Sequence, residues 1–164
     1  MRAIAVHKAG HWPPGAREID AIALDFDHRH RRRVLLTSAA GREILLDLGE
    51  VARLGDGDGL VLDEGGVVRV IAAPEAVLDL HAAPETLLRI AWHLGNRHLP
   101  VQMLGGALRI RADHVIAAMV AGLGGHVHAR EAPFDPEPGA YAGAHAAHDH
   151  ARDHAHDFGH HHDH

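Results

Sequence analysis

Residues 84–98 read PETLLRIAWHLGNRH, and this stretch decides the fold of the second half of the chain. Pro84 fits the first turn of a helix, where its missing N–H costs no hydrogen bond. Apolar residues then recur with helical spacing at Leu87, Leu88, Ala91 and Leu94. Gly95 and Asn96 end the pattern. The stretch therefore predicts one helix with one apolar face.

The flanking sequence predicts several strands and a second helix with one apolar face. Residues 77–80 favour a strand before the helix, and residues 101–104 and 107–110 favour two short strands joined by Gly105 and Gly106. Asp113 is placed to cap a second helix, whose apolar face is Val115, Ile116, Met119, Val120 and Leu123. Residues 126–130 favour a last strand. The order βαββαβ predicts a ferredoxin-like domain.

The first 72 residues have a different pattern. Six short apolar segments alternate with turns rich in Gly and Asp, which predicts a small β-sandwich or a barrel-like domain. The expected strands are 3–6, 19–26, 34–37, 43–48, 60–62 and 67–71. The basic run from Arg29 to Arg33 is expected to be a solvated strand end.

The last residues predict no packed structure. After Pro133, Pro136 and Pro138 the chain is almost free of large apolar residues, so burial cannot offset the loss of chain entropy. The sequence thus predicts an α+β chain with three parts. They are a β-rich domain (1–72), a ferredoxin-like domain (73–142) and a disordered His-rich tail (143–164).

Composition excludes several classes of protein. The chain has no cysteine, which removes disulfides and thiolate metal sites. Its formal net charge of −6 disfavours nucleic acid as the main partner. There is no apolar run long enough to span a membrane, and the first residues do not form a signal peptide, so we expect a cytoplasmic protein.

Motifs of the common catalysts are also absent. There is no phosphate-binding loop, and Lys8 is the only lysine in the chain. A serine nucleophile elbow and the zinc-protease pattern H-E-x-x-H are missing too. We therefore expect a protein that is not an enzyme.

Histidine is the exceptional residue. The chain has 19 histidines, and the last twenty residues contain nine of them: His145, His148, His150, His154, His156, His160, His161, His162 and His164. Neutral imidazole binds nickel, copper and zinc, and the interleaved aspartates add oxygen ligands. Because the longest run is three, an uninterrupted purification tag is a poorer interpretation than a metal-binding tail.

The remaining histidines are harder to interpret from spacing. A single histidine beside a helix end, such as His98, is usually structural unless a two-fold dimer brings two copies together. His126 and His128 share one face of the last strand, which fits an exposed edge or an auxiliary metal site. His28 and His30 fit a solvated turn. No partner is apparent for His7, His11, His81 and His93.

Several segments together resemble one known family, that of the urease accessory protein UreE, a nickel metallochaperone. In the second half these are HLGNRHLPVQ (93–102), LRIRADHV (108–115) and EAPFDPEPGAY (131–141). In the first half they are RVLLT (33–37), GREILLD (41–47) and LGDGD (54–58).

The resemblance implies a peptide-binding-like first domain and a homodimer formed through the second domain. It implies that His98, after Gly-Asn-Arg, is the central nickel ligand, shared by two chains. Some members also carry two histidines around an aspartate before the second helix. Here Ala112 replaces the first of them, so His114 would act alone or with the tail. The implied partners are the GTPase UreG and the urease apoprotein complex.

Two other functions stay open at this point. The tail could store nickel, zinc or copper without delivering it, or residues 1–72 could act as a peptide-binding chaperone in which metal is incidental. Irving–Williams ordering favours copper over nickel at most imidazole sites, so the sequence does not select the metal.

Overall fold

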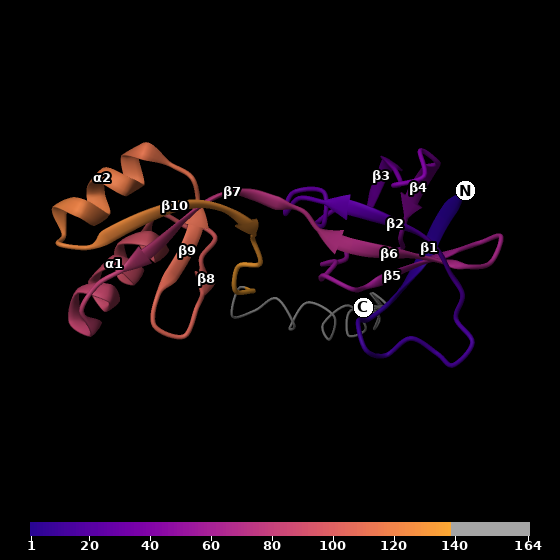
Figure 1. Cartoon of the computed structure of the whole chain (residues 1–164), viewed down its shortest axis with the longest axis horizontal. Helices are drawn as coiled ribbons and strands as arrows, with labels where there is room; N and C mark the ends of the chain where they lie inside the picture. The colour runs from indigo at the N-terminus through magenta and orange to yellow at the C-terminus, as the bar shows by residue number, and fades with distance from the viewer. Residues whose placement is uncertain (139–164) are drawn as a thin grey trace, which may run out of the picture.

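The computed structural model describes residues 1–138, and the predicted disordered tail with its nine histidines lies outside this range. Two sheets make up the described chain, one from each half of the sequence (Figure 1). The first sheet has six strands in the order β2-β6-β5-β1-β4-β3. These strands are β1 (Arg2–His7), β2 (Glu18–Leu24), β3 (Arg33–Thr37), β4 (Glu43–Asp47), β5 (Gly59–Leu62) and β6 (Val67–Ala72).

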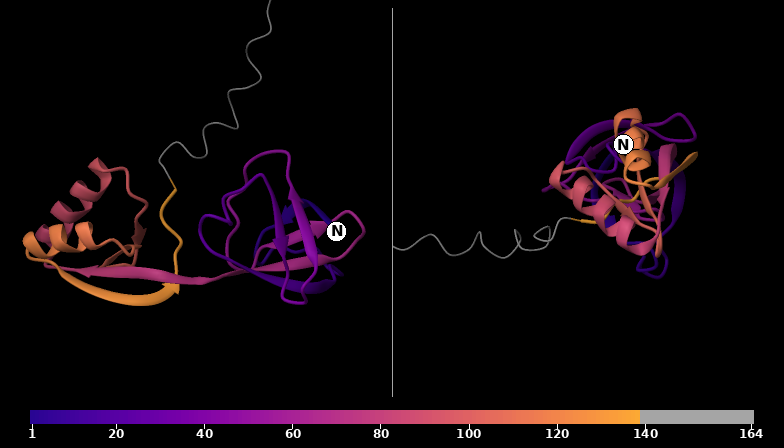
Figure 2. Two further views of the ribbon diagram at one scale, coloured as in Figure 1. Left: turned by 90° about the horizontal axis from the view of Figure 1, so that it is seen from above. Right: turned by 90° about the vertical axis from the view of Figure 1, so that its left-hand side faces the viewer.

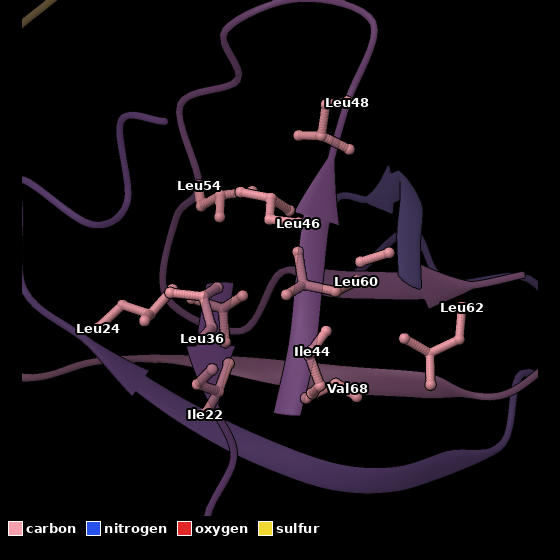
Figure 3. Packing of buried hydrophobic residues seen from close by; sticks show 12 residues of the cluster. Ile22, Leu24, Leu36, Ile44, Leu46, Leu48, Leu54, Leu60, Leu62 and Val68 are labelled. Carbon is pink, nitrogen blue, oxygen red and sulfur yellow. The ribbon is translucent and has the colours of Figure 1, made fainter. Parts of the chain in front are cut away.

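The first sheet curls around a single core. Strands β2 and β3 are its two edges, yet Ile22 and Leu36 belong to the same buried cluster. Leucines and isoleucines from β2, β3, β4 and β5 point into this cluster (Figure 3). The predicted β-rich domain is therefore present, and its form is the barrel-like alternative rather than the sandwich.

The second sheet has the ferredoxin-like arrangement that the sequence predicts. Its strands lie in the order β10-β7-β9-β8, and every neighbouring pair is antiparallel. Its elements are β7 (Pro74–His81), α1 (Pro84–Asn96), β8 (Gln102–Met103), β9 (Leu108–Arg111), α2 (His114–Gly122) and β10 (His126–Pro133).

Both helices cover the same face of this sheet. Figure 2 (left) shows α1 and α2 on one side of the long strands β7 and β10. The core between the layers joins strand residues such as Leu80 and Ile110 to helix residues such as Ile90, Leu94 and Val120. Alternation along the strands places Asp79, by contrast, on the opposite face of the sheet.

Arg29 links the two halves of the chain and corrects one expectation. Its side chain is fully buried, whereas the basic run that it begins was expected to be solvated. The guanidinium donates to the Leu54 carbonyl at 3.1 Å and to the Phe134 carbonyl, and it lies 3.7 Å from Asp135. Backbone carbonyls from both halves thus compensate the buried charge. Arg31, Arg32 and Arg33 are exposed, as expected.

Other contacts hold the same junction. Arg111 donates to Asp27 at 2.9 Å, and the rings of Phe26 and Phe134 meet edge to face with centroids 5.4 Å apart. No helix within residues 1–138 is long and apolar enough to cross a membrane.

Candidate metal centre

His98 lies in the turn that ends α1. The His98 amide donates to the Gly95 carbonyl at 2.9 Å, and the next amide, of Leu99, donates to the Leu94 carbonyl at 3.2 Å. This pair of bonds defines a Schellman motif, in which the residue at the His98 position adopts a left-handed backbone. Leu99 also packs against the core that contains Leu94, which completes the motif.

A histidine at this position is unusual. Among residues 1–138, His98 is the only non-glycine residue with positive φ, at 55°. Glycine normally occupies such a position because a Cβ atom costs roughly 1–2 kcal/mol in the left-handed region. Backbone strain of this kind clusters at functional sites. The conformation is therefore a costly one for a histidine, and it distinguishes His98 from the other described histidines.

The imidazole of His98 is exposed and lines an open groove between the two halves. The groove has a volume of about 580 Å³. Phe26, His30 and Val51 line it from the first half, and Pro138, the last described residue, lies in the same wall. The chain therefore leaves the described range beside His98, toward the histidines of the tail.

His30 is the second histidine of this groove. Its Nδ1 atom lies 2.9 Å from the Phe26 carbonyl, which can only accept a hydrogen bond. In the neutral ring Nδ1 therefore carries the proton, and Nε2 has the lone pair that binds metals. The neighbouring His28 follows the expectation of a solvated turn, because it is exposed and hydrogen-bonded to Asp25 at 2.7 Å.

Electrostatics in that turn favour the ionised carboxylate. Burial raises the pKa of Asp25, but the hydrogen bonds from the His28 backbone and ring outweigh burial, so its pKa lies below the usual value. Asp25 thus stays charged near neutral pH and is already used by His28.

His114 is the first residue of α2 and is exposed. The preceding Asp113 caps the helix, and its carboxylate accepts from the amides of Val115 at 2.8 Å and Ile116 at 3.0 Å. Because Asp113 Oδ1 already accepts both of these hydrogen bonds, the imidazole of His114 is more available than Asp113 to bind a metal ion.

The described residues do not form a closed metal site within one chain. No group of three or more His, Asp or Glu side chains in residues 1–138 is arranged to hold a metal ion. The nine tail histidines lie outside this range. His98 and His114 therefore stand as separate exposed imidazoles in a single chain.

Helix α1, which ends at the turn that holds His98, also carries an exposed apolar surface. Leu88 and Trp92 on α1 are 72% and 65% exposed, although both are large hydrophobic side chains. A groove of about 430 Å³ beside Leu88 is lined mainly by apolar groups, among them Met103. Large exposed apolar side chains one helical turn apart, next to an apolar groove, are typical of protein contacts.

Sequence spacing missed one histidine contact. His81 has no neighbour along the chain, but in the sheet its ring meets the ring of His128 with centroids 5.3 Å apart. His126 lies directly opposite His81 in the register of β7 and β10. The signal that could have found the contact is the pairing of the first and last strands in a ferredoxin-like sheet.

Comparison with known proteins gives one family along the whole chain. The N-terminal domain of the UreE urease accessory protein matches residues 2–73, and the C-terminal domain of the same family matches residues 71–164.

Individual relatives agree with the family matches. Urease accessory protein UreE of Rhodopseudomonas palustris (strain HaA2) is 54% identical over 143 residues, which cover 87% of this chain and 66% of the relative. The protein of the same name from Bradyrhizobium sp. (strain ORS 278) is 52% identical over 87% of this chain and 67% of its own length. That of Beijerinckia indica is 45% identical, with 87% and 82% covered. The chain spans about two thirds of the length of the first two relatives.

Proposed function

Since this chain belongs to the family of the urease accessory protein UreE, we propose that it is a nickel-binding metallochaperone rather than an enzyme, and that it delivers nickel to urease during assembly of the urease metallocentre. The observation that carries the proposal is the exposed imidazole of His98 in a backbone conformation that favours glycine. An exposed ligand on a strained turn suits a site that must bind its cargo and release it.

We propose that the protein is a homodimer in which the two copies of His98 hold one nickel ion. The exposed Leu88 and Trp92 on α1 support this arrangement, because burial of such side chains favours association. A two-fold axis brings both copies of a near-axis residue together. The second copy would thus supply the ligand that a single chain lacks.

The tail is proposed to capture nickel first. Its histidines are dense, so their local concentration around the chain is high. Pro138 lines the groove of His98, and His145 follows seven residues later. An extended chain of that length reaches at most about 25 Å, so the first tail imidazole stays within reach of the groove. Transfer then proceeds by exchange of one imidazole for another.

The proposed receivers are the accessory GTPase UreG and, through it, the urease apoprotein complex. The groove supports a receiver at this place because it is open to solvent and joins both halves, with His30 and His98 in its wall. We propose residues 1–72 as a peptide-binding-like domain, residues 73–142 as the metal-binding and dimerisation domain, and residues 143–164 as the metal-binding tail. The cytoplasmic location stays a prediction.

One experiment distinguishes delivery of nickel to a partner from storage of nickel. The nickel-loaded full-length protein is mixed with the metal-free GTPase, and the nickel that reaches the GTPase is measured after separation of the two proteins. We expect transfer from the wild type, transfer from the His11→Ala control, and greatly reduced transfer from His98→Ala at equal nickel loading. Equal transfer from His98→Ala and wild type would remove His98 from the route, and no transfer from any of them would favour storage.

A further inference from the structure

The face of the second sheet that the helices leave open carries a group of imidazoles. His81 ends β7, and His126 and His128 lie near the start of β10, which pairs with β7. Strand alternation puts all three on the face opposite the helix-covered core. All three side chains belong to exposed residues, and no element of residues 1–138 covers them.

Two of these imidazoles have the spacing of metal ligands. The ring centroids of His81 and His128 are 5.3 Å apart and the ring planes are inclined by 79°. A metal–nitrogen bond of about 2.0–2.1 Å puts each ring centre ~3 Å from the ion, so two imidazoles at a tetrahedral angle have centres about 5 Å apart. The spacing of the two rings therefore suits one shared ion, and rotation of the side chains is needed to direct one nitrogen of each ring at it.

A third imidazole lies next to this pair. His126 is the direct cross-strand partner of His81, and such partners have Cβ atoms about 4.5–5.5 Å apart. A change of side-chain rotamer is enough to turn the His126 ring toward the pair. Because the described side chains do not already gather three ligands, two imidazoles form the initial chelate and the third completes it.

The backbone under the cluster is rigid. Strands β7 and β10 pair without interruption from His81 and His126 to Pro74 and Pro133. A paired ladder fixes the spacing of the ligands before metal arrives, which lowers the entropy cost of binding.

The charges beside the cluster do not exclude a cation. Asp79, opposite His128, accepts from Arg109 at 2.6 Å and 3.1 Å and lies 3.3 Å from Arg130. This carboxylate offsets one of the two guanidinium charges, and its electrostatic interaction with His81 shows that it lies beside the imidazoles. The ligand set is thus neutral imidazole, which late first-row divalent ions prefer to Mg²⁺ or Ca²⁺.

We propose that His81 and His128, with His126 as the third ligand, form a second binding site for a late first-row divalent transition metal ion. The site is separate from His98. His98 shares a groove wall with Pro136 and Pro138, which follow β10, whereas the site lies at the start of β10, ~23 Å along the strand from Pro133. It therefore binds metal independently of the dimer axis and of the groove.

The test uses the full-length chain with its nine tail histidines replaced by asparagine and with His98→Ala and His114→Ala, so that none of the other proposed metal ligands competes. Zinc is the probe, and native mass spectrometry counts the ions bound per chain. We expect one zinc per chain in this background. Adding His81→Ala or His128→Ala should weaken zinc binding by more than about tenfold, since each removes one ligand of the chelate. His11→Ala, an exposed histidine of the first half, is the matched control and should have no effect.

A second measurement needs no substitution at the site. In the same background, the ring ¹⁵N resonances of His81 and His128 should shift together as zinc is added, while that of His11 stays in place. The proposal is overturned if the background takes up no zinc, if the His81→Ala, His128→Ala double variant takes up as much as the background, or if the two rings do not respond. Because His98 is already replaced, none of these results depends on the proposed delivery site.

Discussion

The Leu99 amide donates to the Leu94 carbonyl over 3.2 Å, and this bond closes the end of α1 around His98. Both leucines belong to the packing of the second core, so the turn between them is held from two sides. His98 has no freedom to leave the left-handed region without breaking that closure. The strain at His98 is thus imposed by the fold.

This strain predicts opposite effects of one substitution on stability and on binding. His98→Gly should stabilise the metal-free protein by about 1 kcal/mol, because glycine adopts positive φ without the cost of a Cβ atom. The same change should remove nickel binding at the interface site. Urea denaturation in the presence of a chelator, at one fixed protein concentration, measures the first effect.

The control for this prediction is His98→Ala, which keeps the Cβ atom and should gain none of the stability. A His98→Gly protein that is less stable than the wild type would show that the imidazole itself stabilises the turn.

Nickel uptake by the tail should depend on pH. Only neutral imidazole binds metal, and the unperturbed histidine pKa is about 6.5, so affinity should fall as the pH falls below that value. Nickel titrations of the full-length protein at about pH 7.5 and pH 5.5 bracket this pKa. Equal affinity at the two pH values would mean that histidine is not the main ligand.

The ion pair of Asp79 and Arg109 on the open sheet face makes a pH-dependent contribution to the stability of the fold. The pKa of Asp79 lies below its usual value, mainly because Arg109 donates to the carboxylate, although burial opposes the shift. The native state therefore prefers the ionised form. The resulting stability is present above about pH 4, the unfolded value, and is lost as the pH falls through the lower native pKa.

Asp79→Asn should accordingly cost about 2–4 kcal/mol at neutral pH, because it leaves Arg109 without its charged partner. The difference from the wild type should shrink as the pH is lowered below about 4. Urea denaturation at neutral pH and below about pH 4 measures the two free energies of unfolding. The control is Asp63→Asn, at an exposed aspartate. A cost that does not change with pH would assign the effect to packing instead.

The cap of α2 gives a simpler prediction. Asp113→Ala removes the acceptor of the Val115 and Ile116 amides and should destabilise the protein by about 1 kcal/mol. Asp113→Ser, which keeps a capping oxygen, should restore most of this loss. Chemical denaturation compares the three proteins, and an alanine variant as stable as the wild type would contradict the role of the cap.

Local patterns in the sequence predicted the order of all elements because each pattern is decided within a few residues. Pro84 and the Gly95-Asn96 pair bound α1 as expected, and Asp113 caps α2. Strand lengths were less accurate. Strand β10 reaches Pro133 rather than residue 130, since pairing with β7 continues to Pro74. Such pairing depends on a distant segment and leaves no mark in the local pattern.

The same reason explains what was missed at the candidate sites. Arg29 is buried because the Phe134 carbonyl, far along the chain, accepts from it. The contact of His81 with His128 depends on the register of two strands that are distant in sequence. His98 was identified by resemblance to a family. The positive φ that distinguishes it appears only in the fold.

The measurement that tests the account most directly is a native mass spectrum of the protein with one equivalent of nickel per dimer. The chain carries asparagine at the nine tail histidines together with His81→Ala and His114→Ala, so that the tail, the open-face site and His114 do not compete with His98. We predict a dimer with one nickel ion, and a metal-free dimer when His98→Ala is added. A protein that binds no nickel, or one that keeps its nickel after His98→Ala, would contradict the central claim that two copies of His98 hold the metal.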